Sequence, residues 1–246
     1  MTSATLAPAV DTVADLTPAV DPVAVTATHL VRRYVPAQQV IHWIGVISFF
    51  MLLLTGVALL FPPLSFLAKG GTSGVVHRIG AVAFILLPAL YMLRMPRKAL
   101  ELVRESFTYG REDWEWFKHM PGYIFGSTRN LPPQGRLNAG QKLHHAATFL
   151  MFNSVAISGL LMWFAKGQLG PDGLSAIVIV HDISMLGLSV MMIGHVYFTF
   201  LYGALSGMVT GKVSEEYARM EHRKWYESLQ PETPGAAEKT EARSAE

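Results

Sequence analysis

Four long apolar runs divide this chain, and polar segments separate them. The runs cover residues 40–61, 74–93, 143–164 and 174–201. Each is about 20 residues or longer, the length that an α-helix needs to cross the hydrocarbon core of a bilayer. The pattern therefore predicts an all-α membrane protein built as a bundle of four transmembrane helices. Because the number of spans is even, both termini are expected on one side of the membrane.

The last run carries the clearest chemical signal. It is apolar almost throughout, apart from His181, Asp182 and His195. The two histidines are fourteen residues apart. On a helix this spacing returns them to nearly the same face, separated by about 21 Å along the axis. Ionisable residues inside a span are costly and mark a functional site that faces the bundle interior.

Polar segments surround the four runs. Residues 1–30 lack the basic start and the continuous apolar core of a secretory signal, so we expect a disordered tail. The runs form one domain over residues 31–210, interrupted by a long loop at 95–140. Residues 211–230 have the pattern of a polar amphipathic helix lying on the surface. Residues 231–246 are expected to be a second disordered tail.

The long loop contains local helical signals. Residues 99–107 and 112–120 have helical spacing, and the second stretch presents an aromatic face formed by Trp114, Trp116 and Phe117. Such segments predict short helices at the level of the lipid headgroups.

Composition agrees with a membrane location and narrows the chemistry. The chain has 246 residues, of which 51% are hydrophobic and 15% charged, and its mean hydropathy is +0.31. An ordinary soluble domain is nearer a quarter charged. The net charge of +2 gives no reason to expect nucleic acid as a partner. The sequence has no cysteine, which excludes disulfides, a covalently attached c-type haem and a cysteine-ligated iron–sulfur cluster within this chain.

The basic residues indicate the orientation of the bundle. They gather before the first run, after the last run, and above all between the second and third runs, at Arg94, Arg97, Lys98, Arg104, Arg111, Lys118, Arg129, Arg136 and Lys142. The opposite face has only Lys69 and Lys166, with Arg78 just inside the second run. By the positive-inside rule, the termini and the 95–140 loop are cytoplasmic. We therefore expect a multi-pass protein of the bacterial inner membrane.

This orientation pairs four histidines. His42 and His195 lie near the cytoplasmic side of their spans, whereas His77 and His181 lie near the outer side. Each pair comes from two different helices, as is needed to hold a planar cofactor from both faces. Two axial imidazoles without a covalent attachment motif are typical of b-type haem, so the sequence predicts two b haems that transfer electrons.

Glycines accompany these histidines. His42 and His77 each begin the pattern HxxG, ending at Gly45 and Gly80, and Gly194 precedes His195. A glycine beside a ligand lets backbone and macrocycle approach closely. The alternative is that the histidines form hydrogen bonds between helices.

A second polar group lies at the start of the third run, in the sequence RLNAGQKLHH from Arg136 to His145. Asn138, Gln141 and Lys142 can donate hydrogen bonds to the carbonyls of a quinone, and His144 or His145 could relay protons. The alternative is an ordinary polar helix start with basic residues at the interface.

The four-span layout, HWIG at the first run, GVVHRIG at the second, NAGQK before the third and H-x13-H in the fourth resemble the cytochrome b gamma subunit of respiratory formate dehydrogenase. The likeness runs from about Arg32 to Lys224. It implies that His77 and His181 ligate the outer haem and that His42 and His195 ligate the inner one. It also implies a quinone pocket at Asn138, Gly140 and Gln141, to which Lys142 and His144 are neighbours. The long N-terminal segment departs from the compact start of that family, and the His144–His145 pair leaves the ligand set ambiguous.

The resemblance further implies partners and a direction of electron flow. An iron–sulfur subunit would deliver electrons to the outer haem, and a molybdenum or tungsten subunit would oxidise formate. This chain would pass the electrons to menaquinone or ubiquinone near the cytoplasmic side, and the resemblance allows a higher oligomer. Two other functions stay open: the cytochrome b subunit of a nickel–iron hydrogenase or thiosulfate reductase, and a haem-free transporter with a histidine proton relay.

Overall fold

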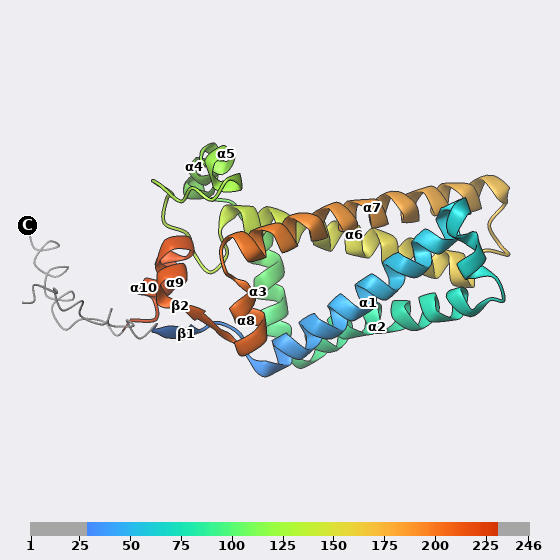
Figure 1. The fold of residues 1–246 in the computed structure, drawn as a ribbon, viewed down its shortest axis with the longest axis horizontal. Coiled ribbons are helices and arrows are strands. Elements are labelled where there is room, and N and C mark those ends of the chain that lie inside the picture. The colour runs from blue at the N-terminus through green and yellow to red at the C-terminus, as the bar shows by residue number, and fades with distance from the viewer. Residues whose placement is uncertain (1–28, 231–246) are drawn as a thin grey trace, which may run out of the picture.

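The computed structural model describes residues 29–230 and contains the four expected long helices (Figure 1). They are α1 (Pro36–Leu60), α2 (Thr72–Arg94), α6 (Ala139–Phe164) and α7 (Pro171–Leu201). All four are long and apolar enough to cross a membrane, which confirms the predicted helical bundle. Of the two predicted tails, residues 1–28 and 231–246 lie outside the described residues.

The four helices form two antiparallel hairpins. In the first, Pro62 and Pro63 end α1 and begin the 3-10 helix η1 (Pro62–Ala68), after which α2 returns. Gly70 and Gly71 make this turn in the left-handed region, with φ of 80° and 77°. α6 and α7 form the second hairpin. Backbones pack closely within each hairpin, whereas close backbone contacts between the hairpins are few. Side chains therefore fill or line the space between them.

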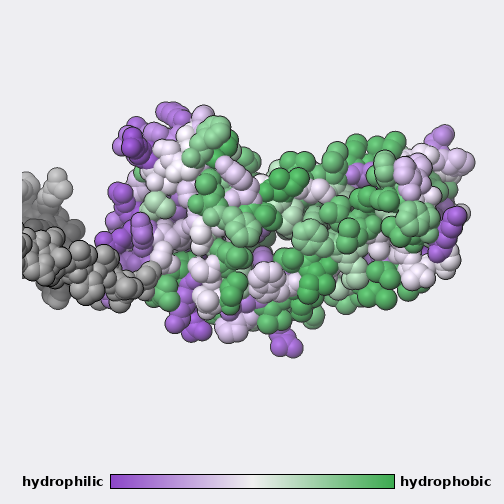
Figure 2. All heavy atoms as spheres, viewed as in Figure 1, coloured by the Kyte–Doolittle hydropathy of each residue, from purple (hydrophilic) through white to green (hydrophobic). Residues whose placement is uncertain are grey.

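The surface of the bundle is apolar. On the face shown in Figure 2, apolar side chains cover the four-helix part, and hydrophilic residues gather at its two ends. Large side chains such as Leu54, Leu93 and Ile193 are exposed on this surface. A band of this extent is unusual for a soluble monomer and is the surface that lipid would cover.

One end of the bundle carries all the remaining elements, which we call the cap. The 95–140 loop supplies α3 (Pro96–Ser106), α4 (Arg111–Lys118) and α5 (Met120–Ile124). The segments before α1 and after α7 supply β1 (Leu30–Arg32), α8 (Leu205–Thr210), β2 (Lys212–Ser214), α9 (Glu215–Glu221) and α10 (Arg223–Glu227). Figure 1 shows them together at this cap end; η1 and the α6–α7 connection lie at the other end, which we call the distal end.

The segment 211–230 differs from the single surface helix that its sequence pattern predicts. It forms β2, which pairs antiparallel with β1, followed by two short helices that break at His222. Ser214 accepts a hydrogen bond from the Tyr217 backbone and caps α9. Tyr217, Glu221 and His222 are buried, so one face of this segment packs against the rest of the cap, whereas Arg219 and Lys224 are exposed.

The aromatic face expected at residues 112–120 is also divided. Trp114 is exposed, whereas Trp116 is buried against Tyr123 and Ala139. The short helices exist as expected, but the second one anchors the cap to the start of α6 as well as facing outward.

Candidate functional site

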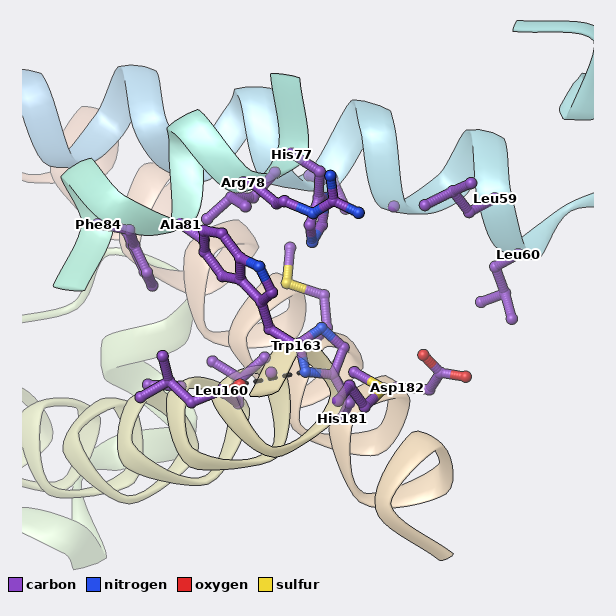
Figure 3. Close-up of a pocket in the computed structure, with 18 of the residues that line it drawn as sticks. Leu59, Leu60, His77, Arg78, Ala81, Phe84, Leu160, Trp163, His181 and Asp182 are labelled. Carbon is purple, nitrogen blue, oxygen red and sulfur yellow. Dashed lines mark hydrogen bonds between the residues drawn. The ribbon is translucent and has the colours of Figure 1, made fainter. Parts of the chain in front are cut away.

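The structure brings His77 of α2 and His181 of α7 together near the distal end. Their ring centroids are 6.4 Å apart. Figure 3 shows both rings pointing into the same cavity from opposite helices, with Trp163 and Arg78 beside them. The cavity has a volume of about 410 Å³ and a mostly apolar lining, which includes Phe49, Phe84, Gly159 and Met185. This volume lies in the range of sites for small ligands and cofactors, about 300–1,000 Å³.

His42 of α1 and His195 of α7 form a matching pair near the cap end. Their ring centroids are 6.2 Å apart. Both pairs thus join one hairpin to the other at positions where the backbones themselves stay apart. The pairing by depth that the sequence predicts is the pairing found in the structure.

The two centroid distances match the geometry of a shared metal ion. If two imidazoles bound one metal ion from opposite sides, each nitrogen about 2.0–2.1 Å from the metal and roughly 1.15 Å from its ring centre, the ring centres would be about 6.4 Å apart. The measured distances of 6.4 and 6.2 Å agree with this value. Both pairs therefore fit a metal-centred group held from its two faces.

Hydrogen bonds orient the distal pair. Nδ1 of His77 lies 2.8 Å from the Thr55 hydroxyl, which itself donates to the Met51 carbonyl at 2.7 Å and therefore accepts from the imidazole. Nδ1 of His181 lies 3.1 Å from the Val155 carbonyl, which can only accept. Both Nδ1 atoms then carry the proton, and both Nε2 atoms keep a lone pair for a metal.

Glycines leave room for the distal rings. A Cβ atom at Gly159 would lie 3.2 Å from Cε1 of His181, and one at Gly56 would lie 3.7 Å from Cε1 of His77. Of the glycines that the sequence pattern singled out, Gly80 is tight against Met51 of α1, at 3.0 Å. In the described part of the chain, a Cβ at Gly45 or Gly194 would meet nothing within 4 Å. These two glycines border open space beside His42 and His195.

The cap-end pair has a different environment. His144 of α6 stacks on His195, with ring centroids 5.3 Å apart and an angle of 26°, and its Nε2 lies 3.1 Å from the Met191 carbonyl. Nδ1 of His42 is buried and has no hydrogen-bond partner among residues 29–230. His144 therefore supports the ring of His195, while His42 lacks the orienting contact that the distal histidines have.

An apolar layer separates the two pairs. Phe49, Val155 and Leu188 are buried together there, packed against side chains that include Leu53, Phe84 and Met151. Phe49 is seven residues from His42, and Leu188 is seven from both His181 and His195. The layer thus lies about 10 Å along the axis from either pair.

The polar residues at the start of α6 also lie at the cap end, but several are engaged within the protein. Asn138 caps the helix by accepting from the Gln141 backbone at 2.8 Å, and its amide nitrogen donates to Glu221 at 2.8 Å. Lys142 forms an ion pair with Asp113 at 2.8 Å. A Cβ at Gly140 would lie 2.7 Å from the Trp116 ring, so the glycine permits that packing.

Glu221 and its neighbours were not predicted from the sequence. Glu221 and His222 are almost completely buried, at 1% and 0% exposure. Burial raises the pKa of the Glu221 carboxyl, and burial together with the charge of Arg33 lowers the pKa of His222 well below its usual value. The four-residue spacing of Tyr217 and Glu221 was a signal for a buried helix face, but the charged residues around it favoured a surface location.

Residues 33–211 match the model of a known family, described as prokaryotic cytochrome b561. The match covers most of the chain. The chain belongs to the prokaryotic cytochrome b561 family. This membership makes it a membrane cytochrome b that takes part in electron transfer, with haem b as its cofactor.

Similar proteins of known name agree with this assignment. The chain is 28% identical to the cytochrome b556 subunit of formate dehydrogenase from Haemophilus influenzae, over 81% of this chain and 83% of that protein. It is 24% identical to two Escherichia coli (strain K12) proteins. One is the cytochrome b556(Fdn) subunit of nitrate-inducible formate dehydrogenase, over 77% and 87% of the two chains. The other is the formate dehydrogenase cytochrome b556(fdo) subunit, over 84% and 96%.

The donor set suits the cofactor that the cytochrome b561 family implies. Among the described residues, no three His, Cys, Asp or Glu side chains converge as a metal site would require. Two imidazoles at each level, a largely apolar cavity and glycines beside the rings instead fit a planar group that supplies the other ligands itself.

Proposed function

We propose that this chain is the membrane-anchoring cytochrome b subunit of a formate dehydrogenase complex, passing electrons across the membrane to a quinone. The observation that carries the proposal is the presence of two histidine pairs at different depths, with ring centroids 6.4 and 6.2 Å apart. The names of the relatives support formate dehydrogenase as the parent complex.

His77 and His181 would hold one haem b, and His42 and His195 a second. A haem b held by two histidines would supply single-electron transfer. The chain's contribution is to orient the rings: Thr55 and the Val155 carbonyl fix the distal pair, and His144 supports His195. The apolar layer around Phe49 and Leu188 keeps water out of the space between the levels.

The orientation is part of the proposal. The positive-inside rule assigns the cap end to the cytoplasm, because the cap holds nearly all the basic residues of the described chain. An iron–sulfur partner and a molybdenum or tungsten catalytic subunit would then act at the distal end. Formate oxidation would take place on that catalytic subunit, and this chain would reduce the quinone.

The quinone, either menaquinone or ubiquinone, would bind near the start of α6, beside Asn138, Gly140, Gln141, Lys142 and His144. The Asn138 amide donates to Glu221, and the Lys142 ammonium donates to Asp113. The carbonyl oxygen of Gln141 accepts from the Asn138 backbone at 3.4 Å, and its side chain also lies beside the Tyr217 hydroxyl. We assign its amide nitrogen as the donor to a quinone carbonyl, with the other residues shaping the pocket.

Cofactor quantitation tests this function directly. The purified chain should contain two haems b per polypeptide by pyridine haemochrome analysis, and formate should reduce both in the complex. One haem per polypeptide would break the proposed route, and the absence of haem would favour a transporter. Reduction by hydrogen but not by formate would assign the chain to a hydrogenase.

A further inference from the structure

A buried carboxyl group lies at the cap end, close to the start of α6. Oε2 of Glu221 accepts hydrogen bonds from the Asn138 amide at 2.8 Å and from the Tyr123 hydroxyl at 2.9 Å. Oε1 is buried and has no partner within residues 29–230. The carboxyl group is therefore satisfied on one oxygen only.

The groups that face Glu221 do not neutralise it with a direct ion pair in the described chain. The positive charge of Arg33 acts on Glu221. Nη2 of Arg33 donates to the Arg136 carbonyl at 2.7 Å and lies 3.1 Å from Nε2 of His222, while its Nη1 is buried and has no partner among residues 29–230. The other titratable groups around the carboxyl are Tyr123 of α5, Tyr202 at the end of α7, and Tyr217 and His222 of its own segment.

This setting favours a neutral carboxyl. Burial raises the pKa of Glu221, while hydrogen bonds from Tyr123 and Asn138 and the charge of Arg33 act in the opposite direction. An ionised carboxylate without a close cation is costly in such an environment. Glu221 is thus a buried carboxyl group with a raised pKa, just outside the span.

The carboxyl connects to the proposed quinone pocket through Asn138. Asn138 donates to Glu221 and also begins α6, where Gln141 and His144 follow. Six residues separate Asn138 from His144, which is about 9 Å along the helix. His144 in turn stacks on His195. Glu221 is therefore hydrogen-bonded to the start of the helix whose His144 stacks on the cap-end pair.

We propose that Glu221 is the internal proton donor for quinone reduction. The proposal rests on the proposed function, because it requires a quinone at the start of α6. Conversion of a quinone to a quinol takes two electrons and two protons. Glu221 supplies one of these protons to a reduced quinone oxygen, with Tyr123 or water as the link. The resulting carboxylate then takes up a proton from the aqueous phase at the cap end.

A purely structural role would predict a different design. A side chain that only tied α9 to α5 and α6 would gain from having both oxygens paired, and a glutamine would serve equally well. The unpaired Oε1 and the absence of an ion pair to Glu221 among the described residues are expected for a group that gains and loses a proton.

The test uses Glu221→Gln in the complete complex with its partner subunits. Glutamine keeps the oxygen that accepts from Tyr123 and Asn138 but has no acidic proton. Haem content and reduction of the haems by formate should be unchanged, while reoxidation of the haems by quinone should slow by about 10²-fold, the low end for general acid catalysis. In the wild type this rate should fall as pH rises above the raised pKa of Glu221, and in the variant the fall should be lost. Glu216→Gln, an exposed glutamate on the same helix, is the matched control.

Infrared difference spectroscopy provides a readout that is independent of turnover. Reduction of quinone by the wild-type complex should change a protonated-carboxyl band that shifts with ¹³C-glutamate, and Glu221→Gln should remove that band. If the variant loses its haems, the test rests on whether the wild-type complex shows the protonated-carboxyl band that shifts with ¹³C-glutamate. Wild-type reoxidation kinetics in Glu221→Gln, or the absence of a glutamate band, would overturn the proposal for Glu221 only. Failure of the wild type to reduce quinone would overturn the proposed function together with it.

Discussion

The imidazole of His77 and the hydroxyl of Thr55 lie 2.8 Å apart, although they belong to different helices of the first hairpin. Thr55 accepts from Nδ1 and donates its own hydrogen bond to the Met51 carbonyl. This contact leaves Nε2 of His77 free and holds the imidazole ring in one orientation. The cap-end histidine on the same hairpin, His42, has no such contact in the described chain.

Replacing Thr55 with valine should raise the midpoint potential of the distal haem. A hydrogen-bonded imidazole is the more basic ligand and stabilises the oxidised iron. Loss of a bond worth about 0.5–1.5 kcal/mol corresponds to roughly 20–60 mV for a one-electron couple. Optical redox titration of both haems measures the shift. Thr210→Val is the control, because that hydroxyl makes a similar backbone bond, to Ser206, away from the histidines. Equal shifts in the two variants would refute the role of Thr55.

His181→Ala should remove the distal haem and keep the cap-end one. The cap-end pair draws its rings from other turns and has its own support in His144. The haem content should fall from two to one per chain, and quinol should still reduce the haem that is left. Retention of both haems would show that His181 is not a ligand.

Gly159→Val should also deplete the distal haem, without changing a ligand. A side chain at this position of α6 begins 3.2 Å from the His181 ring and must displace it. Pyridine haemochrome analysis should again give about one haem per chain. Gly167→Val serves as the control, since a Cβ there meets nothing within 4 Å in the described residues. Normal haem content in both variants would argue against close packing of α6 on the ligand.

Gln141→Ala should slow quinone reduction and leave haem content intact. The substitution removes the amide that we assign to a quinone carbonyl while keeping the Asn138 cap, which binds the backbone of residue 141. The rate of haem reoxidation by quinone measures the effect, with Gln168→Ala at the distal end for comparison. An unchanged rate of haem reoxidation would show that the quinone does not bind at the start of α6.

The sequence predicted the spans and the histidine pairs because both follow from local rules. Apolar length identifies a membrane helix, and the alternation of direction gives each histidine its depth. Thr55 and Gly159 are different, because their importance depends on the rotation of α1 and α6 about their axes. Hydropathy does not encode that rotation. Glu221 was missed for a related reason: its segment is rich in charge, and only tertiary packing against Tyr123 and Asn138 reveals that its inner face is buried.

The two-stranded ribbon of β1 and β2 joins the segment just before α1 to the segment that follows α7 and α8, with Leu30 opposite Ser214 and Arg32 opposite Lys212. α1 carries His42, and α7 carries His195. The ribbon therefore joins the cap ends of α1 and α7, between which the two hairpins have no connecting loop. A slip of one residue in its pairing would draw one chain end along the other by about 3.3 Å. That shift is about half of the 6.2 Å between the ring centroids of His42 and His195. The distance between these two rings therefore depends on strands that lie outside the membrane.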